Sequence, residues 1–188
     1  MKQLLSLLLC LSIIVPSMAK KEQRKQNVFP DGTPISEWFL QTKVVHPDSL
    51  GKKYDLSDYG IESNPHIVQT QKIQKIIDEA AANGGGVIYI PEGIYKSGSL
   101  FFKQGTHLYL SKGATLLGSE NIMDFPLLMT RIEGEYCKYF GALINADGLD
   151  TFTISGKGTI DGNGTPYWKA FRLRREWNPQ CTNKDEMR

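Results

Sequence analysis

Short runs of β-forming residues alternate with polar, usually glycine-containing turns between residues 87 and 164. The runs are VIYIPEG at 87–93, SLFFKQG at 99–105, HLYLSKG at 107–113, ATLLGSE at 114–120, ALINADG at 142–148, TFTISGKG at 151–158 and TIDGNG at 159–164. Such short strands at short intervals are typical of an all-β solenoid, barrel or sandwich. No two runs are joined by an Asn-Gly or Asp-Gly hairpin turn, and they lie too close together for βαβ crossovers. A parallel β-helix satisfies these constraints, so the predicted fold class is all-β.

The interior of such a solenoid is a column of inward-pointing apolar residues stacked coil on coil. The residues predicted to form it are Val87, Ile88, Ile90, Leu100, Phe102, Leu108, Leu110, Leu116, Leu143, Ile144, Phe152, Ile154 and Ile160. An open end of the column would expose apolar side chains and unpaired strand edges. Residues 65–82 are predicted to form a helix that covers this end with one apolar stripe. The stripe consists of Ile73, Ile76, Ile77, Ala80 and Ala81.

This helix has a start signal and a stop signal. Asn64 can cap its first turn, and Pro65 fits the first helical position, where a missing N–H costs nothing. Three glycines follow Asn83 and tolerate positive φ. We therefore expect the helix to end there and the chain to turn directly into the first strands.

By composition the chain divides into three parts. Residues 1–19 have the basic start, apolar run and small-x-small ending of a signal peptide. Export to the periplasm or beyond is expected, without a stable membrane anchor. Residues 20–60 are predicted to be a linker and an N-terminal arm, in which Trp38 can stack on a sugar but is better suited to packing on the body. Residues 61–188 hold the coils, interrupted at 119–140 by an excursion with either a functional or a structural role.

Little in the composition suggests a cofactor. The formal charge of +2 predicts no particular partner, and no nucleic acid. His46, His66 and His107 are isolated from one another and from acidic groups in the sequence, so no metal site is predicted. Cys137 and Cys181 can pair in an oxidising compartment or remain two thiols, because the sequence does not place their Cα atoms.

Three aspartates are candidates for acid or base groups. Asp147, Asp150 and Asp161 lie next to glycines in turn-like segments. Aspartate in such a turn usually accepts hydrogen bonds from nearby backbone N–H groups. We therefore interpret them as turn residues.

Aromatic and basic residues follow the last strand-like run. Tyr167 and Trp168 can form a sugar platform or pack outside the coils. The basic run after them consists of Lys169, Arg172, Arg174 and Arg175. Such a run can attract an anionic chain, although a solvated face is the commoner meaning.

The stretches VIYIPEGIYKSGSLFFKQGTHLYLSKGATLLGSE and TISGKGTIDGNGTPYW resemble the opening of the family 28 glycoside hydrolases, the polygalacturonases and related pectin-degrading enzymes. The resemblance runs from about Tyr54 to Trp168. It implies a right-handed parallel β-helix and inverting hydrolysis of α-linked galacturonic acid by paired carboxyl groups. A pectic polysaccharide such as polygalacturonate is the implied partner.

The catalytic motifs of that family are absent from these 188 residues. The sequence has no Asn-Thr-Asp, no Asp-Asp and no Gly-His-Gly, and Arg131-Ile132-Glu133 departs from the family's Arg-x-Lys. We therefore predict that no catalytic residue lies in this chain, that it is the N-terminal portion of a longer enzyme, and that alone it is inactive. Its substrate-binding residues are not identified by the sequence.

Two alternatives remain open. One is a uronan lyase or another pectin-active enzyme of the same superfamily, although no acidic cluster suited to a lyase's cation is present. The other is a non-catalytic β-helical protein that binds glycans through aromatic and basic residues alone.

Overall fold

The computed structural model describes residues 28–40 and 45–177, with side chains as far as residue 173. The predicted signal peptide at 1–19, the charged segment after it, Cys181 and the side chains of Arg174 and Arg175 lie outside the described residues. The chain forms two compact units, Met1–Thr42 and Lys43–Arg188. No helix in the described ranges is long and apolar enough to cross a membrane.

The first unit contains a cluster of exposed aromatic residues. Val28 and Pro34 form an isolated antiparallel bridge, and the 3-10 helix η1 spans Glu37–Leu40. Trp38 stacks on Phe39 with ring centroids 3.8 Å apart, and Phe29 meets Phe39 edge-on at 6.5 Å. Trp38 nevertheless remains 64% exposed.

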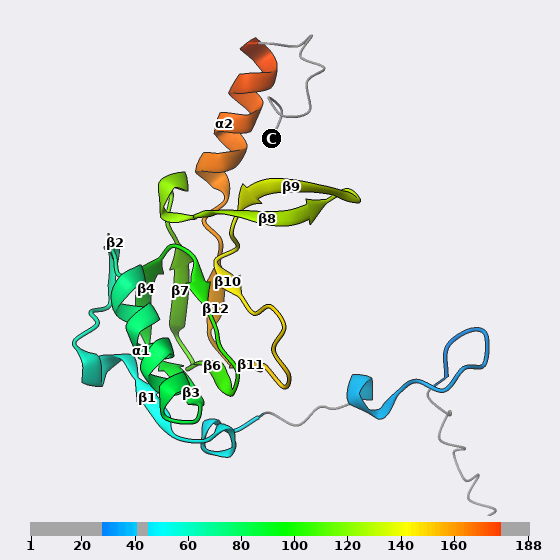
Figure 1. Cartoon of the computed structure of the whole chain (residues 1–188), viewed down its shortest axis with the longest axis vertical. Coiled ribbons are helices and arrows are strands. Elements are labelled where there is room, and N and C mark those ends of the chain that lie inside the picture. Colours follow the sequence, from blue (N-terminus) through cyan, green and yellow to red (C-terminus); the bar gives the residue numbers. More distant parts are fainter. Residues whose placement is uncertain (1–27, 41–44, 178–188) are drawn as a thin grey trace, which may run out of the picture. The chain divides into compact units, whose positions relative to one another are not determined.

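The second unit is a parallel β-helix, which confirms the predicted fold (Figure 1). The first sheet has the order β1 (Lys53–Asp55), β3 (Gly86–Ile90), β6 (Thr106–Leu110) and β11 (Ile154–Gly156). The second sheet consists of β2 (Asn64–Val68), β4 (Gly93–Ser97), β7 (Ala114–Gly118) and β12 (Thr159–Asp161). The third consists of β5 (Leu100–Phe101) and β10 (Ile144–Asn145). Successive coils are therefore β3–β4–β5, β6–β7–β10 and β11–β12.

Residues 45–60 lie in the same unit as the coils. The 3-10 helices η2 (Pro47–Leu50) and η3 (Leu56–Tyr59) flank β1. Strand β1 pairs with β3, and the side chains of Tyr54 and Leu56 are buried in the core. This part of the predicted arm therefore belongs to the first coil, because its apolar residues complete the solenoid interior.

The residues of the apolar column are buried in the middle coils and partly exposed in the last one. Every predicted column residue from Val87 to Leu116 is buried, and three of the later ones are partly buried: Leu143, Ile144 and Phe152. Ile154 and Ile160 align with buried Leu108 and Leu116, yet remain 47% and 43% exposed. These two isoleucines therefore continue the predicted column in register, but they stay exposed because β11 and β12 are the outermost described strands of their sheets.

Helix α1 (Thr70–Ala82) covers the solenoid interior at the first coil, as predicted, but begins later than the sequence suggested. Its stripe residues Ile73, Ile76, Ile77 and Ala80 are buried. Residues 64–68 form β2 instead of a first helical turn, and the Asn64 side chain accepts a hydrogen bond from the backbone N–H of His66 at 2.8 Å. Pairing of β2 with β4 outweighs the local helix-start signal.

The glycine stop signal is confirmed. Gly84 and Gly85 have φ of 90° and 103°, a conformation that L side chains rarely adopt. A Cβ on Gly85 would also overlap the carbonyl oxygen of Gly105 in the next coil. The glycines therefore reverse the chain and permit close stacking of two coils.

The excursion after β7 contains an antiparallel hairpin that the sequence analysis missed. It begins with the 3-10 helix η4 (Ile122–Asp124) and continues as β8 (Leu127–Ile132) and β9 (Glu135–Phe140). Both turn residues, Glu133 and Gly134, have positive φ, as a two-residue hairpin turn of the primed type requires. A second missed element, α2 (Thr165–Trp177), follows β12 and projects from the coils (Figure 1).

Candidate functional site

The coils differ most in length at the turn that follows each strand of the second sheet. After β4 this turn is only Gly98-Ser99, whereas after β7 it is the hairpin excursion and after β12 it is α2. We call residues 98–99, 119–143 and 162–177 the insertion corner. Insertions in successive repeats of a solenoid gather on one face, and that face often binds ligands. The insertion corner is therefore the candidate functional site.

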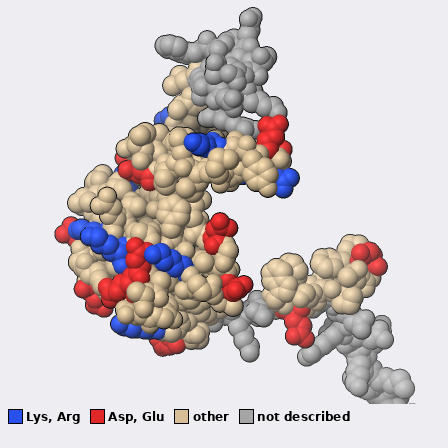
Figure 2. Space-filling model, in the orientation of Figure 1, with Lys and Arg blue, Asp and Glu red and all other residues tan. Residues whose placement is uncertain are grey.

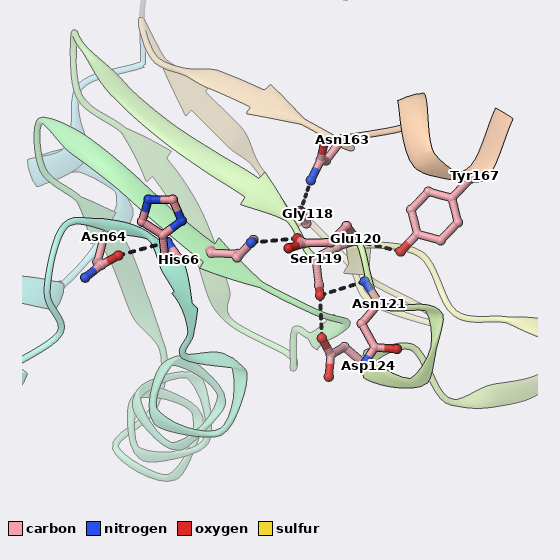
Figure 3. Close-up of polar contacts among 10 residues, drawn as sticks. Asn64, His66, Gly118, Ser119, Glu120, Asn121, Asp124, Asn163 and Tyr167 are labelled. Atoms are coloured by element: carbon pink, nitrogen blue, oxygen red, sulfur yellow. Dashed lines mark hydrogen bonds and ion pairs between the residues drawn. The ribbon is translucent and has the colours of Figure 1, made fainter. Parts of the chain in front are cut away.

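A buried serine fixes the base of the hairpin excursion (Figure 3). The Ser119 hydroxyl donates a hydrogen bond to Asp124 Oδ2 and accepts one from the backbone N–H of Asn121 at 3.1 Å. The carbonyl of Asp124 in turn accepts from the backbone N–H of Ser99 at 3.2 Å. Asp124 thus joins the excursion to the short turn of the preceding coil.

A buried lysine adds an ion pair at the same corner. Lys96 on β4 lies 2.6 Å from Glu120 Oε2, and only 7% of the lysine side chain is exposed, against 52% for the glutamate. The hydrogen bond from Lys96 lowers the pKa of the Glu120 carboxyl below its ordinary value. Glu120 is therefore ionised at neutral pH and partners a cation that would otherwise be buried alone.

Helix α2 is tied to the excursion by a tyrosine. The Tyr167 hydroxyl donates to the carbonyl oxygen of Ser119 at 2.6 Å, and burial raises the pKa of this phenol. Its ring meets Phe125 edge-on at 6.4 Å. Just before the helix, the Asn163 side chain donates to the carbonyl oxygen of Gly118 at 3.1 Å. These contacts set the direction in which α2 leaves the coils.

A cleft of about 840 Å³ lies between the hairpin and the third sheet, and Figure 2 shows the hollow there. It is lined by Phe101, Phe102, Leu128, Met129, Thr130, Ile132, Tyr139, Phe140, Gly141, Ala142, Asn145 and Asp147. The Asn145 amide is already engaged, since its oxygen accepts from Ala142 N at 3.0 Å and its nitrogen donates to Leu100 O at 3.1 Å. The lining is thus largely apolar and aromatic, with one carboxylate at Asp147.

The structure assigns the turn aspartates largely as predicted. Asp161 Oδ1 accepts from the backbone N–H of Asn163 at 2.8 Å, which is a turn role. Asp150 bonds through its backbone, which donates to and accepts from the Gln104 amide. Asp147 lines the cleft, which the sequence did not indicate because the hairpin that forms its other wall was not predicted.

The histidines and the described cysteine do not form a metal site. His46 Nδ1 lies 3.1 Å from Asp48 Oδ2, so the prediction that it is isolated from acidic groups was wrong. The backbone turn at η2 brings these two exposed side chains together. Cys137 is a free, half-buried thiol on β9. Within residues 28–40 and 45–177, no group of three potential ligands is arranged to hold a metal ion.

The two residues of the predicted aromatic platform have different roles. Tyr167 points into the insertion corner and anchors α2, whereas Trp168 is 64% exposed and touches Phe171 edge-on at 6.1 Å. Lys169 and Arg172 are exposed on the same helix. The structure thus separates a packing residue from a residue that faces solvent.

Three carboxylates in or next to the insertion corner hold structure together. Glu120 pairs with Lys96, Asp124 accepts from Ser119, and Asp161 stabilises its own turn. Inverting glycoside hydrolysis needs one carboxyl with a raised pKa and a second one placed to activate water. Glu120 has the opposite shift. These three carboxylates are therefore suited to positioning the hairpin and α2, and no acid–base pair is formed by them.

Comparisons with known proteins relate the chain to a galacturonosidase and to a binding protein. No family model matches the chain. It is 34% identical to the exo-poly-α-D-galacturonosidase of Dickeya chrysanthemi over 152 residues, which is 77% of this chain and 24% of that protein. It is 37% identical to plasmin and fibronectin-binding protein A of Streptococcus pneumoniae over 129 residues, 66% of this chain and 17% of that protein.

A solved structure gives the same relationship. The family 28 exopolygalacturonase of Yersinia enterocolitica matches with a TM-score of 0.52 and 33% sequence identity, covering 60% of this chain and 21% of that one. The chain spans about a quarter or less of the length of each of these three proteins. The sequence match and the structural match thus both point to galacturonan-cleaving enzymes. The chain is a homologue of the polygalacturonases of glycoside hydrolase family 28, matched over part of their length.

Proposed function

We propose that this chain forms coils of a glycoside hydrolase that cleaves α-linked galacturonic acid in pectin. The observation that carries the proposal is the 34% identity to an exo-poly-α-D-galacturonosidase over 152 residues. The parallel β-helix supports it, because a family 28 exopolygalacturonase has a similar structure at 33% identity.

Within that enzyme the described residues would act as scaffold and substrate-facing wall. Glu120, Asp124 and Asp161 are engaged in an ion pair, a hydrogen bond and a turn. The catalytic carboxyl pair is expected outside the 188 residues, because the catalytic motifs of the family that the chain resembles are absent from them. The 188-residue chain alone is therefore expected to be inactive. The hairpin cleft and α2 are the surfaces through which it would contact a polysaccharide.

The test is release of reducing ends from polygalacturonate. The protein encoded by the complete reading frame that contains these residues is assayed beside the 188-residue chain, with products separated by chromatography. We expect galacturonate or its oligomers from the first and no release from the second. Absence of release from the complete protein on polygalacturonate and on esterified pectin would overturn the proposed activity. Release by the 188-residue chain would overturn the scaffold role.

A second candidate function is binding without catalysis. The 37% identity to plasmin and fibronectin-binding protein A favours it, because that protein is named for binding and not for hydrolysis. Under this function the complete protein would retain plasmin or fibronectin on a sensor surface and release no sugar. The two candidates therefore predict opposite results in the reducing-end assay.

We also propose that the protein is exported. The composition of residues 1–19 supports this, with Lys2 before an apolar run and Ser17-Met18-Ala19 at its end. Fusion of residues 1–26 to a reporter that is active only after export tests it. A fusion that stays inactive while its expression is normal would contradict export.

A further inference from the structure

We propose that the exposed face of α2, formed by Trp168, Lys169 and Arg172, binds an anionic galacturonan chain. The identity of this polysaccharide rests on the proposed function, whereas its charge and ring chemistry follow from the helix itself.

Positive charge is concentrated on this helix. Residues 165–177 include four basic residues and one acidic residue, a net charge of +3, whereas the whole chain carries +2. The side chains of Lys169 and Arg172 are exposed, and one helical turn separates them. A polyanion is therefore attracted to α2 more strongly than to the rest of the chain.

The helix also presents an aromatic surface. Trp168 is 64% exposed, and Arg172 follows it by four residues, which places both on one side of the helix. An indole face packs against the apolar face of a pyranose ring, while guanidinium and ammonium groups hydrogen-bond a carboxylate. A uronate residue combines that apolar ring face with a carboxylate.

The surface is held in a fixed position. Trp168 N donates to Gly164 O at 3.0 Å, and the neighbouring Tyr167 is bonded to Ser119 O at 2.6 Å. The contact between Asn163 and Gly118 braces the turn before the helix. Binding here therefore requires little ordering of the first turn of α2, which keeps the entropic cost low.

Charge distinguishes α2 from the hairpin cleft. The residues lining the cleft include the carboxylate of Asp147 and no basic residue. Figure 2 shows acidic side chains on the rim of the coils beside that hollow. A uronate is therefore expected to bind more favourably on α2 than in the cleft.

The test measures binding of the 188-residue chain to unesterified polygalacturonate by affinity electrophoresis at low salt. We expect K169Q/R172Q to weaken binding about tenfold, because two cation contacts are lost, and added salt to narrow the difference. We expect Trp168→Ala to weaken it about three- to tenfold, and Trp168→Tyr to restore most of the loss. The matched control is K112Q/K157Q, which removes two exposed lysines from turns of the coils.

Several results would overturn the proposal. One is that the wild-type chain does not bind polygalacturonate, and another is that K112Q/K157Q weakens binding as much as K169Q/R172Q does. The proposal also fails if the wild-type chain binds fully methyl-esterified pectin as tightly as polygalacturonate. It fails as well if the α2 variants weaken binding of single-stranded DNA by the same factor as binding of polygalacturonate. Unchanged circular dichroism and melting temperature of the variants would exclude misfolding as the cause. Hydrolysis by the complete protein with normal binding by the α2 variants would refute this inference alone. Loss of binding in the variants without hydrolysis by the complete protein would refute only the proposed activity.

Discussion

The contact between α1 and the third sheet offers the sharpest test of how the helix closes the solenoid. β5 has β10 on one edge, and Gln74 of α1 occupies the other edge. The Gln74 amide donates to Phe101 O at 2.9 Å and accepts from Phe101 N at 2.8 Å. One side chain thus takes the place of a neighbouring strand.

Gln74→Met should destabilise the second unit by about 2–3 kcal/mol, because each unsatisfied buried backbone group costs about 1–3 kcal/mol and both groups of Phe101 lose their partner. The lower part of the range applies because both residues are only partly buried and water reaches the site. Methionine has nearly the helix propensity and length of glutamine, so neither explains a loss. For roughly 150 residues this corresponds to a fall in Tm of about 4–12 °C.

Urea unfolding followed by circular dichroism measures the change, with Gln71→Met as the control on an exposed position of the same helix. We expect Gln71→Met to stay within about 0.5 kcal/mol of wild type, as exposed substitutions usually do. If the two variants are equally stable, the Gln74 amide does not act as a strand substitute, and the reasoning is wrong.

Two further predictions concern titration and the insertion corner. Burial lowers the pKa of His107 below its ordinary 6.5, so the unfolded chain binds the proton more tightly and stability should fall as pH drops below 6.5. Urea unfolding between pH 7 and 5 should show a shallower dependence of stability on pH for His107→Gln than for wild type, and an equal dependence in the two proteins would contradict the burial effect. Tyr167→Phe should lose about 1 kcal/mol and speed amide hydrogen exchange in α2, since the bond to Ser119 is removed; unchanged exchange would contradict the anchoring role.

The repeat of short runs and glycine turns predicted the β-helix because parallel coils need both signals in every turn. It missed β4, whose Lys96 interrupts the apolar pattern. This lysine is buried only because Glu120, from the following coil, pairs with it. A partner supplied by another coil cannot be seen in the local sequence.

The hairpin and α2 were missed for different reasons. The hairpin turns at Glu133-Gly134, and glutamate is not a residue that normally marks a primed turn, although its φ of 51° shows that it adopts one. The sequence of α2 predicts only a basic run, because its residues do not form a strong apolar stripe at helical spacing. The aromatic and basic residues of the proposed binding surface are visible in the sequence. Only the structure shows that Tyr167 anchors the helix while Trp168 faces solvent.

The location of the insertion corner follows from how the coils stack on one another, and no local sequence signal encodes this stacking. Gly98, Ser119 and Tyr167 are far apart in the chain, and they meet because β4, β7 and β12 lie side by side in one sheet. A coil that keeps the short Gly98-Ser99 turn leaves room beside it, and Asp124 of the next coil fills that room so closely that a Cβ on Gly98 would overlap its carbonyl oxygen. The excursion is thus supported by the short turn of the preceding coil, and α2 is in turn bonded to the excursion. This arrangement lets the solenoid carry insertions of different length at the insertion corner without changing the register of its coils.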